Sequence, residues 1–429
     1  MRRAFVNARL LDPASGLDTK GGLLVIDEAI ADRGAHVRPG ELSADTEIVD
    51  CEGHCLAPGL VDMRTQFREP GEEHKETIDS ISRAAAAGGI TALAGLPNTQ
   101  PVIDDVAVVE FVARRAREVK LVKIFVYGAA TRGLEGQQIT EMGLLKEAGA
   151  LAFTDGTKAI ASARVMRHAL SYASAFGALI IQHPEDPSLA RGGDMNEGEL
   201  ATRLGLAGIP AEAEAMMLER DRRLVRLTNG RYHAAHTSTA HGLEVIRQAK
   251  AEGLRITADT APPYFALNEN AVDEYRTFAK VSPPLRAEHD RMAVVEALKD
   301  GTIDVIASDH SPHDQESKRI PFAQAEPGMA GVETLLPLAL ELYHDGHLPL
   351  LDLLRKMTAA PAELLGLPLG TLGIGKPADL VVFDLDRPFR IDVKNSAGKS
   401  KNAPYEGRPA QGQVRMTVVD GRIVYQAID

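Results

Sequence analysis

APGLVDMRTQFREPG, residues 57–71, is the stretch of this 429-residue chain that decides the fold. It begins with an apolar run from Gly59 to Met63, continues with polar side chains and breaks at Pro70-Gly71. Continuous apolar runs of this kind are typical of parallel strands that are covered on both faces. In a (β/α)8 barrel the carboxyl end of such a strand faces the active site, so we expect chemistry at residues 64–68.

Short apolar runs alternate with segments of helical spacing through the centre of the chain. The predicted strands are residues 59–66, 90–96, 121–127, 150–154, 178–183, 231–236, 254–259 and 303–308. A segment with helical spacing follows each of the first seven, and a long polar loop follows the eighth before a helix at 331–343. Eight strand-then-helix units predict an α/β fold, a (β/α)8 TIM barrel.

Both ends of the chain carry short β-like pieces separated by turn residues, and Asp420-Gly421 is a strong hairpin signal. Two terminal β segments that flank a long α/β region most simply pack together as one small composite β-sandwich domain. The expected division is 1–56 and 372–429 for the two parts of that domain and 57–371 for the barrel. The polar stretch 394–412 is expected to be mobile, and the insertion 184–209 after the fifth strand is a candidate lid.

Charge and cysteine content indicate the cellular compartment and exclude some classes of partner. Acidic residues outnumber basic ones 60 to 48, which disfavours nucleic acid or an anionic membrane as a partner. Cys51 and Cys55 are too few to form a disulfide framework, which fits a reducing cytosol. The N-terminus has no apolar signal region, and the longest weakly polar run, 84–97, is shorter than the roughly 20 residues of a membrane span. We therefore expect a cytoplasmic protein without nucleic-acid or membrane partners.

Polar side chains follow six of the predicted strands at the point where each strand ends. They are Arg64, Gln66, Arg68, Asn98, Asp155, His183, His236, Asp309, His310 and His313. Any one of them has a structural explanation, but the barrel brings all six strand ends to one mouth. Histidine and aspartate side chains held close together are unfavourable unless a cation or a substrate satisfies them. The pattern therefore predicts an active site at this mouth.

The opening stretch resembles the first motif of the dihydroorotases in the cyclic amidohydrolase family, which reads PGLVDxHxHxREPG. The residues of REPG are present at 68–71, whereas Arg64 and Gln66 stand where the family has two metal-binding histidines. The resemblance runs from about Leu10 to Tyr425. It implies a TIM barrel of the metal-dependent amidohydrolase type.

The resemblance also implies roles for individual residues. The metal ligands that it implies are Asp155, His183, His236 and Asp309. Asp309 would also be the general base that takes a proton from water and delivers it to the leaving amide nitrogen. The contacts that it implies for the substrate carboxylate are Arg68, Asn98 and His313, and a backbone contact to the pyrimidine ring would come from near Pro327-Gly328.

Departures from the family motifs change the expected metal content. Arg64 and Gln66 remove the defining ligands of one metal position. Asp155, His183 and His236 would still supply three ligands to the other position and leave room for water, which is the usual form of a catalytic zinc site. We therefore expect one zinc per chain, or none. Tyr264 and Ser282 also differ from the family's substrate-contact motifs.

Arg64 itself leads to a structural expectation. The vacated metal position would leave Asp155 and Asp309 facing each other, and two like charges in a partly dehydrated pocket are unfavourable. The guanidinium carries a permanent charge and its fork suits carboxylates, so we predict an ion pair from Arg64 to Asp309 or to Asp155. Such a pair would lower the basicity of Asp309.

Two functions remain open on the sequence. The first is a dihydroorotase-type hydrolase that converts the cyclic amide of dihydroorotate to N-carbamoyl-aspartate, in de novo pyrimidine biosynthesis, on a reduced, single-zinc site. The alternative is a catalytically inactive dihydroorotase-like subunit that assembles with and supports aspartate carbamoyltransferase. Hydantoinase or allantoinase is a distant third, because those relatives are expected to carry a carboxylatable lysine where this chain has Asp155. A homo-oligomer is expected for either of the first two.

Overall fold

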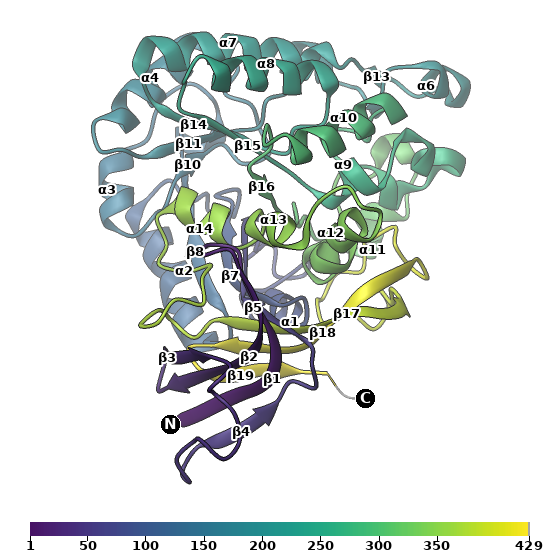
Figure 1. The fold of residues 1–429 in the computed structure, drawn as a ribbon. Helices are drawn as coiled ribbons and strands as arrows, with labels where there is room; N and C mark the ends of the chain where they lie inside the picture. The colour runs from purple at the N-terminus through teal and green to yellow at the C-terminus, as the bar shows by residue number, and fades with distance from the viewer. Residues whose placement is uncertain (428–429) are drawn as a thin grey trace.

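A parallel α/β barrel forms the centre of the computed structural model, which describes residues 1–427. Figure 1 shows it above a sheet that contains both ends of the chain. The barrel strands are β6 (Leu60–Thr65), β7 (Ile90–Gly95), β8 (Lys123–Val126), β9 (Gly128–Ala129), β10 (Phe153–Thr154), β11 (Leu179–Gln182), β14 (Arg231–Ala234), β15 (Ile256–Thr260) and β16 (Val305–Ile306). All eight predicted strand positions carry a strand, so the predicted barrel is confirmed.

Contacts beyond the regular ladders complete the ring. The amide of Tyr127 donates to Gly95 O, and that of Gly128 to Ala152 O, so the sheet continues from β8 into β10. At the other end, Gln66 N donates to His310 O at 2.9 Å, which joins β6 to the segment after β16. The first and the last strand positions therefore meet at the barrel mouth.

Helices cover the outside of the barrel, and α4, α7 and α8 lie side by side in Figure 1. The longer helices are α1 (Ile78–Ala87), α2 (Val106–Val119), α4 (Ala163–Ser174), α7 (Glu212–Thr228), α8 (Ala240–Ala251), α10 (Glu288–Lys299) and α12 (Leu335–His344). Several begin at a side-chain cap: Thr77 and Ser80 form a capping box at α1, and Thr239 accepts from Gly242 N at α8. None of the helices in residues 1–427 is both long and apolar enough to cross a bilayer.

Short elements occupy the loops between strands and helices. They are α3 (Met142–Glu147), α5 (Pro187–Ala190), β12 (Met195–Asn196), α6 (Glu199–Leu204), β13 (Gly208–Ile209), α9 (Pro262–Ala266), α11 (Gln315–Lys318), α13 (Leu350–Arg355), α14 (Ala359–Leu365) and 3-10 turns at Arg132–Leu134, Glu269–Tyr275, Thr277–Ala279, Phe322–Gln324 and Val332–Thr334. Four of them lie within the insertion 184–209, which is therefore folded rather than open.

The two ends of the chain share one sheet. Its strands are β1 (Arg2–Asp12), β2 (Leu17–Ile26), β3 (Ala29–Gly34), β4 (Glu47–Asp50), β5 (Cys55–Pro58), β17 (Leu380–Arg390), β18 (Pro409–Val419) and β19 (Arg422–Gln426). β5 pairs with β1 on one side and antiparallel with β17 on the other, so it links the two termini directly before the chain enters the barrel. The predicted composite β domain is confirmed. Cys51 and Cys55 are buried free thiols.

The polar stretch 394–412 is packed, so its predicted mobility is wrong. Asn402 and Tyr405 in this stretch are 1% and 2% exposed. The Asn402 side chain accepts from His313 N at 3.0 Å and donates to Ser311 O at 2.9 Å and to Gly328 O at 3.1 Å. The polar composition therefore reflects hydrogen bonds to barrel loops in place of hydrogen bonds to water.

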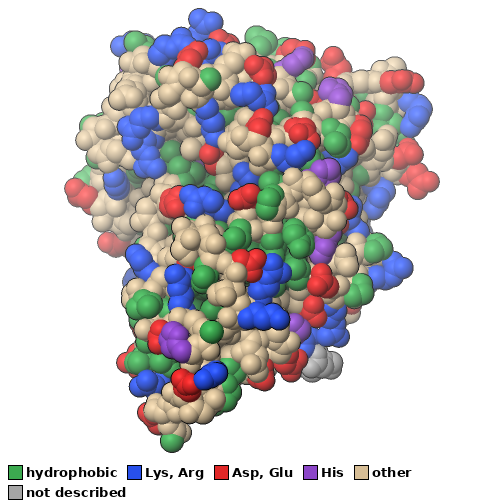
Figure 2. Space-filling view, viewed as in Figure 1, with side chains coloured by type: hydrophobic (Ala, Val, Ile, Leu, Met, Phe, Trp, Pro, Cys, Tyr) green, Lys and Arg blue, Asp and Glu red, His purple; other side chains and the backbone are tan. Residues whose placement is uncertain are grey.

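Surface charge is mixed on the face shown in Figure 2, where Lys and Arg side chains lie among Asp and Glu side chains. The whole chain has a formal net charge of −12. At the barrel mouth Arg64 and Arg68 are buried, whereas Asp309 is partly exposed.

Candidate active site

A cavity of about 290 Å³ opens at the carboxyl ends of the barrel strands. Side chains that follow β6, β7, β14 and β16 line it. Those predicted from the sequence are Gln66, Arg68, Asn98, His236, Asp309 and His313. The structure therefore brings together most of the polar strand-end residues.

Three residues that line this cavity have left-handed backbone. Arg68, His236 and Asp309 have φ values of 62°, 37° and 50°. Each such residue costs about 1–2 kcal/mol relative to ordinary backbone, and strain of this kind clusters at functional sites. Asp259 supports one of them, because its carboxylate accepts from His236 N at 2.6 Å. The same carboxylate holds the buried ring of His233 at 2.8 Å, which keeps that ring away from the cavity.

Arg64 and Asp309 form a close ion pair, with 2.8 Å between Arg64 Nε and Asp309 Oδ1. The Arg64 side chain is 2% exposed. Its Nη2 also lies 3.3 Å from Gly156 O and 3.3 Å from His236 Nε2. The predicted ion pair is confirmed, and its acceptor is Asp309.

Burial and charge set the ionisation of this pair. Burial disfavours the charged form of Asp309, but the hydrogen bonds from His236 and Arg64 and the positive charge of Arg64 outweigh it and hold the pKa of Asp309 well below its usual range. Burial, followed by repulsion from Arg64, lowers the pKa of His236 to about 4. Since the Arg64 charge is permanent, the site near neutral pH contains a guanidinium, a carboxylate and a neutral imidazole.

This ionisation fixes a chain of hydrogen bonds. A carboxylate only accepts, so neutral His236 carries its hydrogen on Nδ1 and donates it to Asp309 Oδ2 at 3.0 Å. His236 Nε2 is then the acceptor for Arg64 and for His183, whose Nδ1 lies 2.7 Å away. The lone pair that a metal would need on His236 is therefore already used by two donors.

Asp155 faces away from this pair. Its carboxylate accepts from the backbone N and the hydroxyl of Thr131 at 2.8 and 2.5 Å. Burial raises the pKa of Asp155 to about 6. In the described part of the chain no ion pair joins it to Arg64, so the alternative partner in the predicted ion pair is not used.

The predicted metal ligands do not converge in this arrangement. Within residues 1–427 no group of three or more His, Cys, Asp or Glu side chains is placed to hold a metal ion. A zinc site requires several unprotonated donors aimed at one point. Here His183 and His236 bond to each other, Asp155 bonds to Thr131, and the Arg64 cation lies against His236 and Asp309. This donor set does not fit a zinc ion.

A second network lines the other side of the cavity. Arg68 Nη2 lies 3.2 Å from His313 Nε2, and Arg68 Nη1 donates to Glu72 at 2.9 Å. Gln66 donates to Ser311 Oγ at 2.9 Å and accepts from Asn98 Nδ2 at 2.9 Å. Gln66 therefore links the ends of β6, β7 and β16, a role that its reading as a lost metal ligand did not suggest.

Sequence reasoning missed several residues that hold the site in place. Ser311, Thr131 and Asp259 each bond directly to a predicted site residue. Glu185, on the insertion after β11, lies 3.5 Å from His183 Nε2. Of the residues at altered family positions, Ser282 lines the cavity, while the Tyr264 hydroxyl donates to Pro283 O at 3.1 Å. Glu185 lies two residues after His183, whereas the other contacts join segments at least 19 residues apart, so no local sequence signal marks them.

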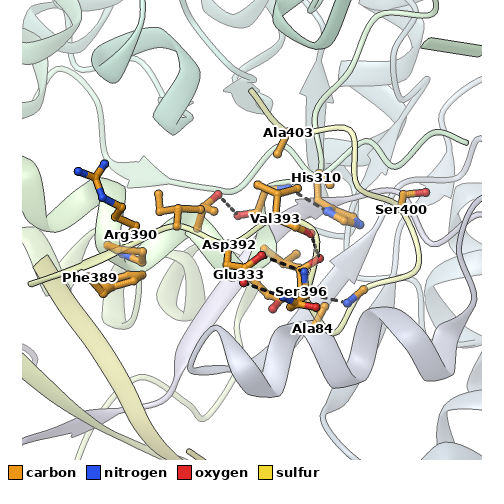
Figure 3. Close-up of a pocket in the computed structure, with 18 of the residues that line it drawn as sticks. Ala84, His310, Glu333, Phe389, Arg390, Asp392, Val393, Ser396, Ser400 and Ala403 are labelled. Atoms are coloured by element: carbon orange, nitrogen blue, oxygen red, sulfur yellow. Dashed lines mark hydrogen bonds between the residues drawn. The ribbon is translucent and has the colours of Figure 1, made fainter. Parts of the chain in front are cut away.

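His310 lies outside the active-site cavity. It lines a second cavity, of about 390 Å³, between the barrel and the C-terminal segment (Figure 3). Its Nδ1 accepts from Gly331 N at 3.1 Å, so its Nε2 carries the hydrogen and lies 3.8 Å from Glu76 Oε2. His310 is therefore a buried residue behind the active site, although the sequence grouped it with Asp309 and His313.

Comparisons with known proteins agree with this architecture. A family model described as Dihydro-orotase-like matches residues 53–242. A dihydroorotase of Anaplasma phagocytophilum is 47% identical over 427 residues, 99% of this chain and 95% of that protein. A dihydroorotase of Syntrophotalea carbinolica is 44% identical over 429 residues, 100% of both chains.

Solved structures of related barrels superpose over the whole chain. An L-hydantoinase (dihydropyrimidinase) from Arthrobacter aurescens has a TM-score of 0.88 and 25% identity, and the match covers 99% of this chain and 96% of that one. A dihydropyrimidinase from Brevibacillus agri has a TM-score of 0.87 at 22% identity, over 99% and 95% of the two chains, which shows a shared fold.

Replacing Arg64 by Met tests the ion pair through stability. We expect the free energy of unfolding to fall by about 3 kcal/mol at pH 7, because Asp309 is left buried and charged without its cation. Folding lowers the pKa of Asp309, so the stabilisation is present above the unfolded-state pKa of about 3.9 and is lost as the pH falls through the folded-state pKa. In urea titrations the difference between wild type and variant should therefore shrink below about pH 4.

Arg83→Met is the matched control, since Arg83 pairs with Asp79 on the exposed face of α1 and its loss should change little. If the loss of unfolding free energy in Arg64→Met stays constant from neutral pH into acid, the stabilisation does not come from the Asp309 carboxylate.

Proposed function

The chain belongs to the dihydroorotase family of cyclic amidohydrolases, and we propose that its barrel mouth binds dihydroorotate and N-carbamoyl-aspartate and interconverts them slowly. The relatives support hydrolysis of a cyclic amide in pyrimidine biosynthesis, and the hydantoinase neighbour supports an enzyme of the same broad class. The observation that carries the proposal is a single cavity with Arg68, Asn98 and His313 on one side and Asp309 on the other.

Arg68 is the proposed anchor for the substrate carboxylate. The Arg68 side chain is 7% exposed, and its guanidinium can bind both oxygens of a carboxylate at once. It already pairs with Glu72, which is also held by Lys75 at 2.5 Å, so Glu72 keeps a cation when Arg68 turns to the ligand. Asn98 and His313 lie at the edge of the same cavity and add neutral hydrogen-bonding groups.

Asp309 is the proposed base, and the Arg64 ion pair limits it. General-base catalysis is most efficient when the pKa of the base is close to the working pH. Arg64 and His236 hold the pKa of Asp309 far below that range, so it accepts a proton from water reluctantly. His236 is neutral and already donates to Asp309, so it offers no compensating positive charge. We therefore propose low turnover on an intact ligand pocket.

Metal content is part of the same proposal. Family members generally depend on a metal, whereas the donors of this chain are bonded to one another and to Arg64. Binding of a single zinc by Asp155, His183 and His236 would require the two histidine rings to separate and Asp155 to leave Thr131. We propose that the resting protein binds at most one zinc per chain and carries out its slow reaction with its own residues.

A second candidate function is favoured by the same Arg64 contacts. If the ligand pocket is not used, the chain is a catalytically inactive subunit that supports aspartate carbamoyltransferase. The specific observation in its favour is that Arg64 removes both the basicity of Asp309 and the metal-binding lone pair of His236. Both candidates place the chain in a cytoplasmic assembly, with several copies of itself or with the transferase.

Arg68→Ala tests the proposed function. We expect the wild type to bind dihydroorotate in calorimetry and the variant to bind it more weakly by about 1.5–3 kcal/mol, the typical contribution of a hydrogen bond to a charged group. Arg83→Ala on the exposed face of α1 should bind like the wild type. A wild type that shows no binding, with or without aspartate carbamoyltransferase, would refute the proposal and favour the inactive subunit.

The double change Arg64→His with Gln66→His tests the cause of low turnover. It restores the two histidines of the family motif and removes the cation that competes with a metal. We expect zinc per chain, measured by elemental analysis, to rise above the wild-type value and the rate of carbamoyl-aspartate cyclisation to rise with it. Arg64→Met with Gln66→His is the control, because it removes the charge but supplies only one histidine.

The outcomes of the double change separate two explanations. A variant that takes up zinc and stays inactive would move the defect to the altered substrate contacts near Tyr264 and Ser282. A variant that takes up no more zinc than the wild type would contradict the idea that Arg64 and Gln66 are what keeps metal out.

A further inference from the structure

Lys318, the last residue of α11, is a buried lysine with an unusual set of partners. Its side chain is fully buried. Nζ donates to three backbone carbonyls, those of Glu326 at 2.6 Å, Gly328 at 3.1 Å and Lys280 at 3.4 Å. In the described residues no carboxylate lies within ion-pair distance of it. A buried ammonium is unfavourable unless its hydrogen bonds are satisfied, and here three carbonyls satisfy three N–H groups.

The segment that Lys318 holds forms one wall of the active-site cavity. Residues 326–329 all line that cavity. Gly328 has a φ of +139°, and a Cβ placed there would lie 2.4 Å from Ser311 Oγ and 3.0 Å from His313 Nε2. Its amide donates to Lys280 O at 2.8 Å, and its carbonyl also accepts from Asn402. Small shifts of this segment therefore act directly on His313 and Ser311.

We propose that Lys318 is a positioning residue whose ammonium holds residues 326–328 against the ligand cavity, so that ligand affinity depends on its protonation. An ammonium supplies three hydrogens to the three carbonyls. A neutral amine supplies two and turns a lone pair toward the third oxygen, which loosens the segment. The inference rests on the proposed function only in taking dihydroorotate as the ligand.

The surroundings of Lys318 bring its pKa into the physiological pH range. Burial, followed by the charge of Lys280, lowers the pKa of Lys318 to about 7, and Glu326 opposes this. Lys280 is itself paired with Asp194 on the insertion after β11, at 3.2 Å. His313 is near enough to be affected by Lys318, but burial and Arg68 lower the pKa of His313 to about 2, so it stays neutral near pH 7.

The sign of the effect follows from linkage. Below about pH 7 Lys318 is protonated and the segment is held in place. Above that pH the amine is neutral. Binding of a ligand that needs the ordered wall must then be accompanied by protonation of Lys318. Its affinity then falls by up to tenfold per pH unit until it reaches a plateau.

Calorimetry of dihydroorotate between pH 6 and pH 9 tests the proposal on the full-length protein. The wild type should bind at pH 6.5 and lose at least fivefold in affinity by pH 8.5. Lys318→Met keeps the apolar stem and removes the donors, so its binding should be weak and independent of pH. Lys280→Met removes the neighbouring positive charge but keeps the backbone carbonyl, so the loss of affinity should move to higher pH.

A ligand-free measurement separates this inference from the proposed function. At pH 6.5, hydrogen exchange in residues 326–329 should be faster in Lys318→Met than in the wild type. Faster exchange with no dihydroorotate binding at any pH would refute the proposed function and leave the positioning role standing. A wild-type pH profile that persists unchanged in Lys318→Met would overturn the inference. If Lys318→Met does not fold, a Lys280→Met profile that coincides with the wild type overturns it instead.

Discussion

The ion pair between Arg64 and Asp309 is the interaction on which the rest of the barrel mouth depends. Its permanent charge keeps Asp309 ionised at the end of β16, and the Asp309 carboxylate then fixes the tautomer of His236. That tautomer leaves His236 Nε2 as an acceptor, which Arg64 and His183 both use. A single arginine on β6 thus determines the protonation and hydrogen bonding of residues from three other strands.

Positive charge carried by the chain itself is a recurring device at this mouth. Arg64 pairs with a carboxylate, Arg68 faces the ligand cavity, and Lys318 is satisfied by backbone carbonyls. The whole chain has a net charge of −12. These three cations are buried, so water and salt screen them little. An anionic ligand such as dihydroorotate would meet the guanidinium of Arg68 in this cavity. The same charges oppose a divalent metal ion, which connects ligand preference with the altered motif.

Periodicity and charge made much of this predictable from the sequence. The eight barrel strands follow from short apolar runs, whereas the Arg64 pair follows from the metal position that the resemblance to the dihydroorotases implies beside Asp155 and Asp309. Three features could not be predicted in this way: the orientation of Asp155 toward Thr131, the bridging role of Gln66, and the hydrogen bonds of Asn402 to the barrel loops. Each depends on contacts between segments far apart in the chain, and a polar residue in such a segment looks the same whether it faces water or a barrel loop.

We propose that the Arg64 guanidinium takes the place of a metal cation, and a crystal soaked in zinc tests this most directly. Diffraction data collected on both sides of the zinc absorption edge would reveal any bound ion as an anomalous peak. We predict no peak beside Asp309, with the guanidinium still against the Asp309 carboxylate. A zinc peak at that point, with Arg64 displaced from Asp309, would contradict this proposal.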